Sequence, residues 1–154
     1  MTTATAAPDA TARRTGVRGA HARRWPTGLG IAATTASLAL ISPLPDRLQT
    51  GVSAWGLLTA AVIYLTWGTA RGELGARGWL TAQTAAVLGF GAIAIAAATA
   101  DAAARYVLAA GWLAHAAWDV AHHRADRVVP HWYAELCMVC DLIVAAALLT
   151  VGTF

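Results

Sequence analysis

The stretch Gly111-Trp-Leu-Ala-His-Ala-Ala-Trp-Asp-Val-Ala-His-His123 determines how the rest of the chain is interpreted. It places ionisable side chains inside a long apolar segment, where they are costly unless they face a protein interior or a wet cavity. On an α-helix, His115, Asp119 and His122 project within about 60° of one another, with His123 beside them. We therefore expect one helix of a bundle whose polar side chains face the other helices.

The composition indicates a multi-pass membrane protein. Hydrophobic residues make up 58% of the 154 residues and charged residues only 12%, whereas an ordinary soluble domain is about 25% charged. The chain has no Lys, and many of its Arg lie in the first 24 residues. This bias suits an anionic membrane surface, so the net charge of +3 does not lead us to expect a nucleic-acid partner.

Apolar segments follow a basic tail over residues 1–24, which we expect to be disordered. A cleaved signal peptide or an organelle transit peptide is the alternative interpretation of this leader. Each apolar segment is near the roughly 20 residues that cross a bilayer core, and backbone in lipid must form its own hydrogen bonds. The expected fold is an all-α, five-span transmembrane helical bundle over residues 25–154, with spans at about 25–44, 52–70, 79–100, 104–123 and 132–152.

Arginine placement predicts the orientation of this bundle. With the N-terminus inside, only Arg47 and Arg105 fall in outside loops, and every other Arg is cytoplasmic. This is a strong positive-inside bias. We therefore expect an N-in, C-out protein of the cell inner (plasma) membrane, with the lipid bilayer as a partner and a second copy of the chain as a candidate partner.

Small residues at four-residue spacing predict where helices approach one another closely. The pairs are Gly28 and Ala32, Ala85 and Gly89, and Ala92 and Ala96. The alternative explanation for these pairs is that the composition is simply rich in Ala.

The last apolar segment supplies partners for the polar stretch. It forms a helical hairpin with the preceding segment across the short connection at residues 124–131. Counted from the ends of this hairpin, His115 and Asp141 both lie roughly 12 Å into the membrane, and Asp119 and Cys137 both lie roughly 6 Å deep. We therefore expect His115 to meet Asp141, and Asp119 to lie at the level of Cys137.

The polar cluster supports several chemical hypotheses. One is a metal site, because His and Asp are ligands for zinc or iron. Another is acid–base catalysis on a lipophilic substrate by a His–carboxylate pair. A third is a proton or ion path. The structural alternative is that His115 and Asp119 simply pair with Asp141, Tyr64 or Gln83 and lock the bundle. Each such polar pair contributes about 0.6–2 kcal/mol.

These hypotheses share one set of residues. The expected catalytic residues are His115, Asp119 and Asp141. The candidate ligands of a divalent metal, zinc or iron, are His115, Asp119, His122, His123 and Asp141. The residues expected to line a cavity for a lipophilic small molecule are Trp112, Trp118, Cys137, Tyr64 and Gln83.

The pair Cys137 and Cys140 has the spacing of redox-active dithiols. A small quinone-linked thiol oxidoreductase of the vitamin K epoxide reductase type would need a second cysteine pair, and this chain has two Cys in all. We therefore favour packing roles for these thiols.

The polar residues also form a longer pattern. It reads His-x-x-Trp-Asp-x-x-His-His at 115–123, Pro-x-Trp-Tyr at 130–133 and Cys-x-x-x-Asp at 137–141. The pattern resembles small bacterial integral-membrane proteins of unknown function, which implies one shared site and no particular activity. Its Asp119-x-x-His122-His123 part also resembles one histidine box of membrane desaturases, although those enzymes carry several boxes. We expect a membrane-embedded enzyme, with a small transporter or channel subunit and a purely structural membrane protein as alternatives.

Overall fold

A computed structural model describes residues 24–76 and 78–150 of the chain. Within these ranges the predicted all-α fold is confirmed. The tail expected over residues 1–24 lies, apart from Arg24, outside the described residues. The elements are α2 (Trp25–Ile41), α3 (Asp46–Ala70), the 3-10 helix η1 (Glu73–Gly75), α4 (Trp79–Thr99), the 3-10 helix η2 (Asp101–Ala103), α5 (Ala104–Ala125) and α6 (His131–Thr150).

Three helices in the described ranges, α3, α4 and α6, are long and apolar enough to cross a membrane. The apolar helix α2 is shorter, at 17 residues. Helix α5 has 22 residues, but its His and Asp side chains lower its overall hydropathy. The three apolar helices support a membrane protein.

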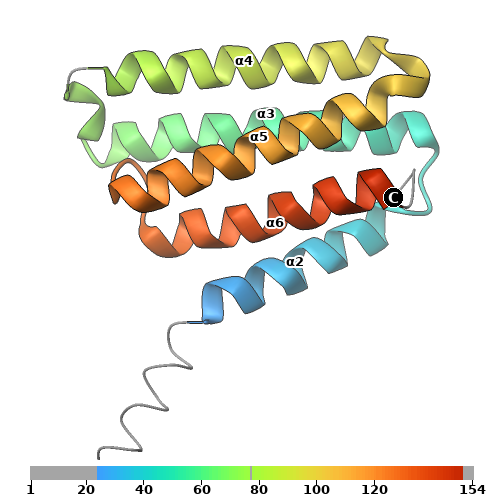
Figure 1. Ribbon diagram of the computed structural model, residues 1–154, viewed down its shortest axis with the longest axis horizontal. Helices are drawn as coiled ribbons and strands as arrows, with labels where there is room; N and C mark the ends of the chain where they lie inside the picture. The colour runs from blue at the N-terminus through green and yellow to red at the C-terminus, as the bar shows by residue number, and fades with distance from the viewer. Residues whose placement is uncertain (1–23, 77, 151–154) are drawn as a thin grey trace, which may run out of the picture.

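Consecutive helices run in alternate directions, so the connections between them lie at the two ends of the bundle (Figure 1). Helix α5 packs against α3, α4 and α6, while α2 lies on the outside of the bundle against α6. We call the end where α3 and α5 finish and α4 and α6 begin the arginine-rich end. Its described arginines are Arg24, Arg71, Arg124 and Arg127, whereas the opposite end has Arg47 and Arg105.

Helix α3 begins at Asp46, earlier than the expected start near Val52. An acidic side chain in a first turn is favoured by the helix dipole, so Asp46 belongs to the helix and not to a loop. The Gln49 amide nitrogen donates to the carbonyl oxygens of Ser42 and Leu44, at 3.1 and 2.6 Å. These bonds hold a tight turn between α2 and α3.

The small residues expected at helix contacts are all exposed instead: Gly28, Ala32, Ala85, Gly89, Ala92 and Ala96. Close approach occurs at other glycines. A Cβ atom on Gly30 would lie 3.0 Å from the Leu136 carbonyl oxygen, and one on Gly111 would lie 2.7 Å from the Leu57 side chain. The prediction was wrong because a four-residue spacing defines a helix face but does not say which face turns inward.

The connection between α5 and α6 is held by Glu73 of η1. Val128 in this connection has a φ of +71°, which is costly for a β-branched residue. Its backbone N–H donates to the Glu73 carboxylate at 2.8 Å, and Glu73 also pairs with Arg71 at 2.9 Å. The connection thus fixes the hairpin that brings α6 against α5.

The interior has two halves of different chemistry. Towards the arginine-rich end, buried polar side chains form what we call the polar half: Tyr64, Gln83, His115, Asp119, His122 and Asp141. Towards the opposite end, buried aliphatic side chains form the apolar half: Leu57, Ala94, Ala97, Leu108, Ala145 and Leu148.

Candidate functional site

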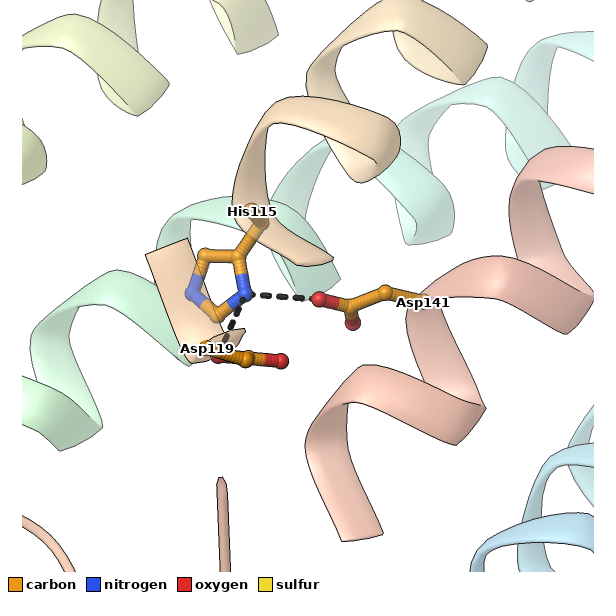
Figure 2. A group of neighbouring side chains, drawn as sticks. All are labelled: His115, Asp119 and Asp141. Carbon is orange, nitrogen blue, oxygen red and sulfur yellow. Dashed lines mark hydrogen bonds and ion pairs between the residues drawn. The ribbon is translucent and has the colours of Figure 1, made fainter. Parts of the chain in front are cut away.

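The centre of the polar half is a cluster of His115 and Asp119 from α5 and Asp141 from α6 (Figure 2). All three side chains are buried. The Nδ1 atom of His115 lies 2.7 Å from Oδ2 of Asp141 and 3.4 Å from Oδ1 of Asp119. The contact predicted between His115 and Asp141 from their equal depths is confirmed.

Tyr64 of α3 completes this cluster. Its hydroxyl donates to Oδ1 of Asp119 at 2.6 Å, and its ring meets the His115 ring edge-on with centroids 5.5 Å apart. Cys137, expected at the level of Asp119, packs with Tyr133 against the buried residues around Tyr64. The pairing of Asp119 with Tyr64, one of the contacts expected if polar pairs lock the bundle, is confirmed.

Two buried atoms of the cluster have no hydrogen-bond partner among the described residues: Nε2 of His115 and Oδ2 of Asp119. In Figure 2, the free Asp119 oxygen is turned to the side of Asp141, while Nε2 of His115 points away from both carboxylates. A buried polar atom left unpaired costs about 1–3 kcal/mol, and more when it is charged. These atoms are therefore positioned for a ligand or a reacting group.

The charge of the cluster is unbalanced. It holds two carboxyl groups and one imidazole, and no arginine of the described ranges forms an ion pair with either carboxylate. Buried charges are costly unless they are paired. The cluster can therefore accommodate a further positive charge, either a proton or a cation.

His122 is also buried, but its hydrogen bonds are satisfied. Its Nδ1 atom lies 2.9 Å from the carbonyl oxygen of Trp118, which can only accept, so Nδ1 carries the proton. Its Nε2 atom then accepts from the Gln83 amide at 2.7 Å. The rings of Tyr64, Trp79 and Trp118 lie around it, with centroids 4.7–5.5 Å away. Both ring nitrogens are used, so His122 does not join the predicted metal ligands.

His123 lies outside the cluster as well. Its ring lies against His131 with centroids 4.2 Å apart. Within the described residues, the group with metal-ligand spacing is His115, Asp119 and Asp141, whose ligand atoms all lie within 4.8 Å of one another. The sequence suggested five ligands because helical periodicity alone cannot distinguish a free imidazole from one that is already hydrogen-bonded.

The residues expected to line one cavity lie in different places. Tyr64 and Gln83 are bonded within the polar half, and Trp118 packs on His122. Cys137 is half-buried beside Tyr133. Trp112, in contrast, lines a groove of about 280 Å³ between α2 and the bundle.

The groove approaches the cluster through Trp112, although none of the three cluster residues lines it. The indole N–H of Trp112 donates to Ser53 at 2.9 Å, and its ring centroid lies 6.5 Å from that of His115. Cys140, which directly precedes Asp141, also lines the groove. The sequence did not predict this groove, because nothing in it shows that α2 packs on α6. The remaining lining residues are Ala33, Thr34, Ser37, Leu38, Ile41, Val52, Gly56 and Val144.

Comparison of the chain with protein families, curated proteins and solved structures finds no match. The class defined by the fold and the cluster is a helical membrane protein with a buried His/Asp group. The resemblance to small bacterial integral-membrane proteins stays a prediction.

Proposed function

We propose that the protein is a membrane-embedded enzyme that acts on a lipophilic substrate at His115, Asp119 and Asp141. One observation carries this proposal. A buried cluster with unpartnered polar atoms lies next to a groove whose walls are mostly apolar. Ligand sites commonly combine an apolar surface with a few convergent polar groups.

We further propose five spans, N-in and C-out, in the cell inner membrane. The alternating helix directions gather most described arginines at one end, which fits a cytoplasmic face. Helix α5 suits a span because its polar groups are buried while Leu113, Ala114 and Ala117 are exposed. Reporter domains fused after residue 154 test this orientation: a reporter active only outside the cytoplasm supports C-out, and a reporter active only in the cytoplasm contradicts it.

The cluster has the groups needed for chemistry on a weakly polar molecule. A carboxylate next to Nδ1 orients an imidazole, which can then accept or donate a proton at its other nitrogen. Alternatively, the carboxylates can hold an ion that polarises a substrate oxygen. Both routes use His115, Asp119 and Asp141.

The extent of the polar network favours an enzyme over a proton path. A path across the membrane needs polar or wet connections to both sides. Beyond His115, the buried side chains include Leu57, Leu108 and Leu148, and no ionisable side chain is buried there among the described residues, although Trp112 donates to the buried Ser53. The network therefore serves one half of the bundle.

The groove favours a substrate with a hydrocarbon chain. Its volume of about 280 Å³ is at the small end of ligand sites, so it suits one chain and not a bulky ring system. Helix α2, which supplies part of its lining, lies on the outside of the bundle, where lipid chains would have access (Figure 1).

Untargeted mass spectrometry of lipid extracts tests this function. Cells that express the wild type, Asp141→Asn, Ser37→Trp or Ala36→Trp are compared with cells that lack the protein. Ser37 lines the groove, whereas Ala36 is exposed next to it and does not line it. We expect the wild type and Ala36→Trp to change the level of one class of lipophilic compound, and Asp141→Asn and Ser37→Trp to leave it unchanged.

Two results would overturn the proposal. A folded Asp141→Asn variant that changes the extract as much as the wild type would remove the cluster from the chemistry. A wild-type extract equal to that of cells without the protein would favour a structural role for the cluster.

A further inference from the structure

We infer that His115, Asp119 and Asp141 bind one divalent transition-metal ion, with Zn²⁺ or Fe²⁺ as the ions that fit best. We infer metal binding from the geometry of the cluster alone. The part this ion would take in a reaction rests on the proposed function.

The donor set is the first argument. One imidazole and two carboxylates, from two packed helices, place their ligand atoms within 4.8 Å of one another. Imidazole with carboxylate is a common environment for zinc and iron. Three protein ligands also leave a coordination position open for water or substrate, as catalytic sites do.

The unpartnered Asp119 oxygen is a second, independent argument. Asp119 is 0% exposed, and its Oδ2 atom has no hydrogen-bond partner among the described residues. Figure 2 shows this oxygen turned to the side of Asp141 and so towards the other carboxylate. An ion there would give Oδ2 the partner that it lacks.

Charge is the third argument. The two carboxylates lie in a buried site with no arginine paired to them in the described ranges. A proton shared with His115 neutralises only part of this charge. A divalent cation neutralises both carboxylates and removes the cost of burying them unpaired.

The observed spacing needs little adjustment to accept an ion. Tetrahedral ligands about 2.0–2.1 Å from a metal lie roughly 3.3 Å apart. The Nδ1 atom of His115 is 3.4 Å from the Asp119 oxygen and 2.7 Å from the Asp141 oxygen. These two distances, the first of which is measured to Oδ1 of Asp119, lie near the spacing of a metal site, and the whole set lies within 4.8 Å and would close around a bound ion.

The surrounding residues fit an outer shell for this site. The Tyr64 hydroxyl donates to Oδ1 of Asp119 and orients the carboxylate, which leaves Oδ2 available. Such outer hydrogen bonds commonly orient metal ligands. His122 is excluded as a ligand because both of its nitrogens are hydrogen-bonded.

Elemental analysis of the full chain, purified in detergent without chelators, tests the inference. Zinc, iron, manganese and copper are measured before and after loading with Zn²⁺ or with Fe²⁺ under anaerobic conditions. We expect about one ion per chain in the wild type and in His123→Gln, whose residue lies on the same helix but outside the cluster. Asp141→Asn should lower the affinity by about tenfold or more, because a direct ligand is lost.

X-ray absorption of the loaded wild type keeps the test decisive if Asp141→Asn does not fold. We expect nitrogen and oxygen ligands with an imidazole signature and no sulfur. A sulfur shell would assign the ion to Cys137 or Cys140 and overturn the inference. A wild type that takes up no ion, or a folded Asp141→Asn that binds as well as the wild type, would overturn it too.

The two proposals fail in different ways. If the wild type takes up no ion but still changes the lipid extract, the metal inference fails and the enzyme remains. If the loaded wild type binds one ion but leaves the extract unchanged, the enzyme fails and the metal site remains.

Discussion

The two halves of the bundle interior are built from the same helices, α3 to α6, and use opposite chemistry. The apolar half is filled by aliphatic side chains that pack closely around Gly111. The polar half instead holds His, Asp, Tyr and Gln side chains, and some of their buried atoms have no partner. A core that only stabilised the fold would leave few polar atoms unpaired.

Within the polar half, the pair of Gln83 and His122 differs from the cluster of His115, Asp119 and Asp141. The pair of Gln83 and His122 uses both imidazole nitrogens, as expected for a structural contact. The cluster of His115, Asp119 and Asp141 leaves a nitrogen and an oxygen unpaired. Gln83 also has a buried oxygen, Oε1, without a partner among the described residues, so unpaired atoms alone do not separate the two groups. The cluster differs because it combines such atoms with two buried carboxyl groups that no arginine of the described ranges pairs with.

Removal of the imidazole from the cluster should have the largest effect on stability. His115→Leu leaves two buried carboxylates without their partner, so we expect the free energy of unfolding to fall by about 3–5 kcal/mol. Leu108→Ala in the apolar half removes volume but no charge, and should cost about 2–5 kcal/mol, depending on how far the site collapses. Reversible unfolding in detergent measures both. Wild-type stability in His115→Leu would show that the carboxylates are not charged together.

A side chain at Gly111 tests the close packing of the apolar half. Its Cβ would lie 2.7 Å from the Leu57 side chain and 2.8 Å from that of Ile93, so Gly111→Val should cost about 1–3 kcal/mol. Gly28 has no atom within 4 Å of an added Cβ and gives the matched control, Gly28→Val. Equal melting temperatures for the two variants would contradict close packing at Gly111.

Loss of the Tyr64 hydroxyl should have a smaller effect. Tyr64→Phe removes the donor to Asp119 and keeps the ring, so we expect a loss of about 0.6–2 kcal/mol, the range for a polar contact between membrane helices. Tyr106 is exposed, and Tyr106→Phe should change little. If the proposed metal site is present, Tyr64→Phe should also weaken metal binding while Tyr106→Phe does not.

The smallest effect is expected outside both halves, at Glu73. The N–H of Val128, together with Arg71, holds the pKa of the Glu73 carboxyl below its ordinary value near 4.5. This contribution to stability is therefore present above the ordinary pKa and is lost as the pH falls through the lower folded value. Melting temperatures measured between about pH 6 and pH 3 should fall less steeply for Glu73→Gln than for the wild type. Asp46→Asn, an exposed carboxyl at the other end, controls for the loss of any single charge, and an unchanged slope in Glu73→Gln would contradict the role of Glu73.

Much of the helical architecture could be predicted from local sequence. Apolar length and Pro or Gly punctuation placed each helix within a few residues, apart from the start of α3 at Asp46. Equal depth in the α5–α6 hairpin also predicted the contact of His115 with Asp141. Both predictions depend on the regular rise of a helix, which a sequence expresses directly.

Contacts between distant helices could be predicted only as a set of alternatives, in which Tyr64 and Gln83 were candidate partners of His115 and Asp119. Tyr64 meets Asp119, and Gln83 meets His122, across 55 and 39 residues of chain. No periodicity in either helix specifies its rotation relative to the other. The sequence therefore suggested five candidate metal ligands. In the structure, both ring nitrogens of His122 are hydrogen-bonded, which removes it from that set.

By itself, the sequence determined that this chain is apolar, helical and built around an ionisable stretch, because hydropathy and helical spacing are local properties. The tertiary structure alone decided which side chains of that stretch keep polar atoms without a hydrogen-bond partner and can therefore bind a ligand. Packing of α4 on α5 gave Nε2 of His122 a hydrogen bond from Gln83, in addition to the bond that Nδ1 makes within α5 to Trp118. The same packing of helices left Nε2 of His115 and Oδ2 of Asp119 without a partner among the described residues. The availability of a polar atom depends on its neighbours in space, and those neighbours come from helices far apart in the chain.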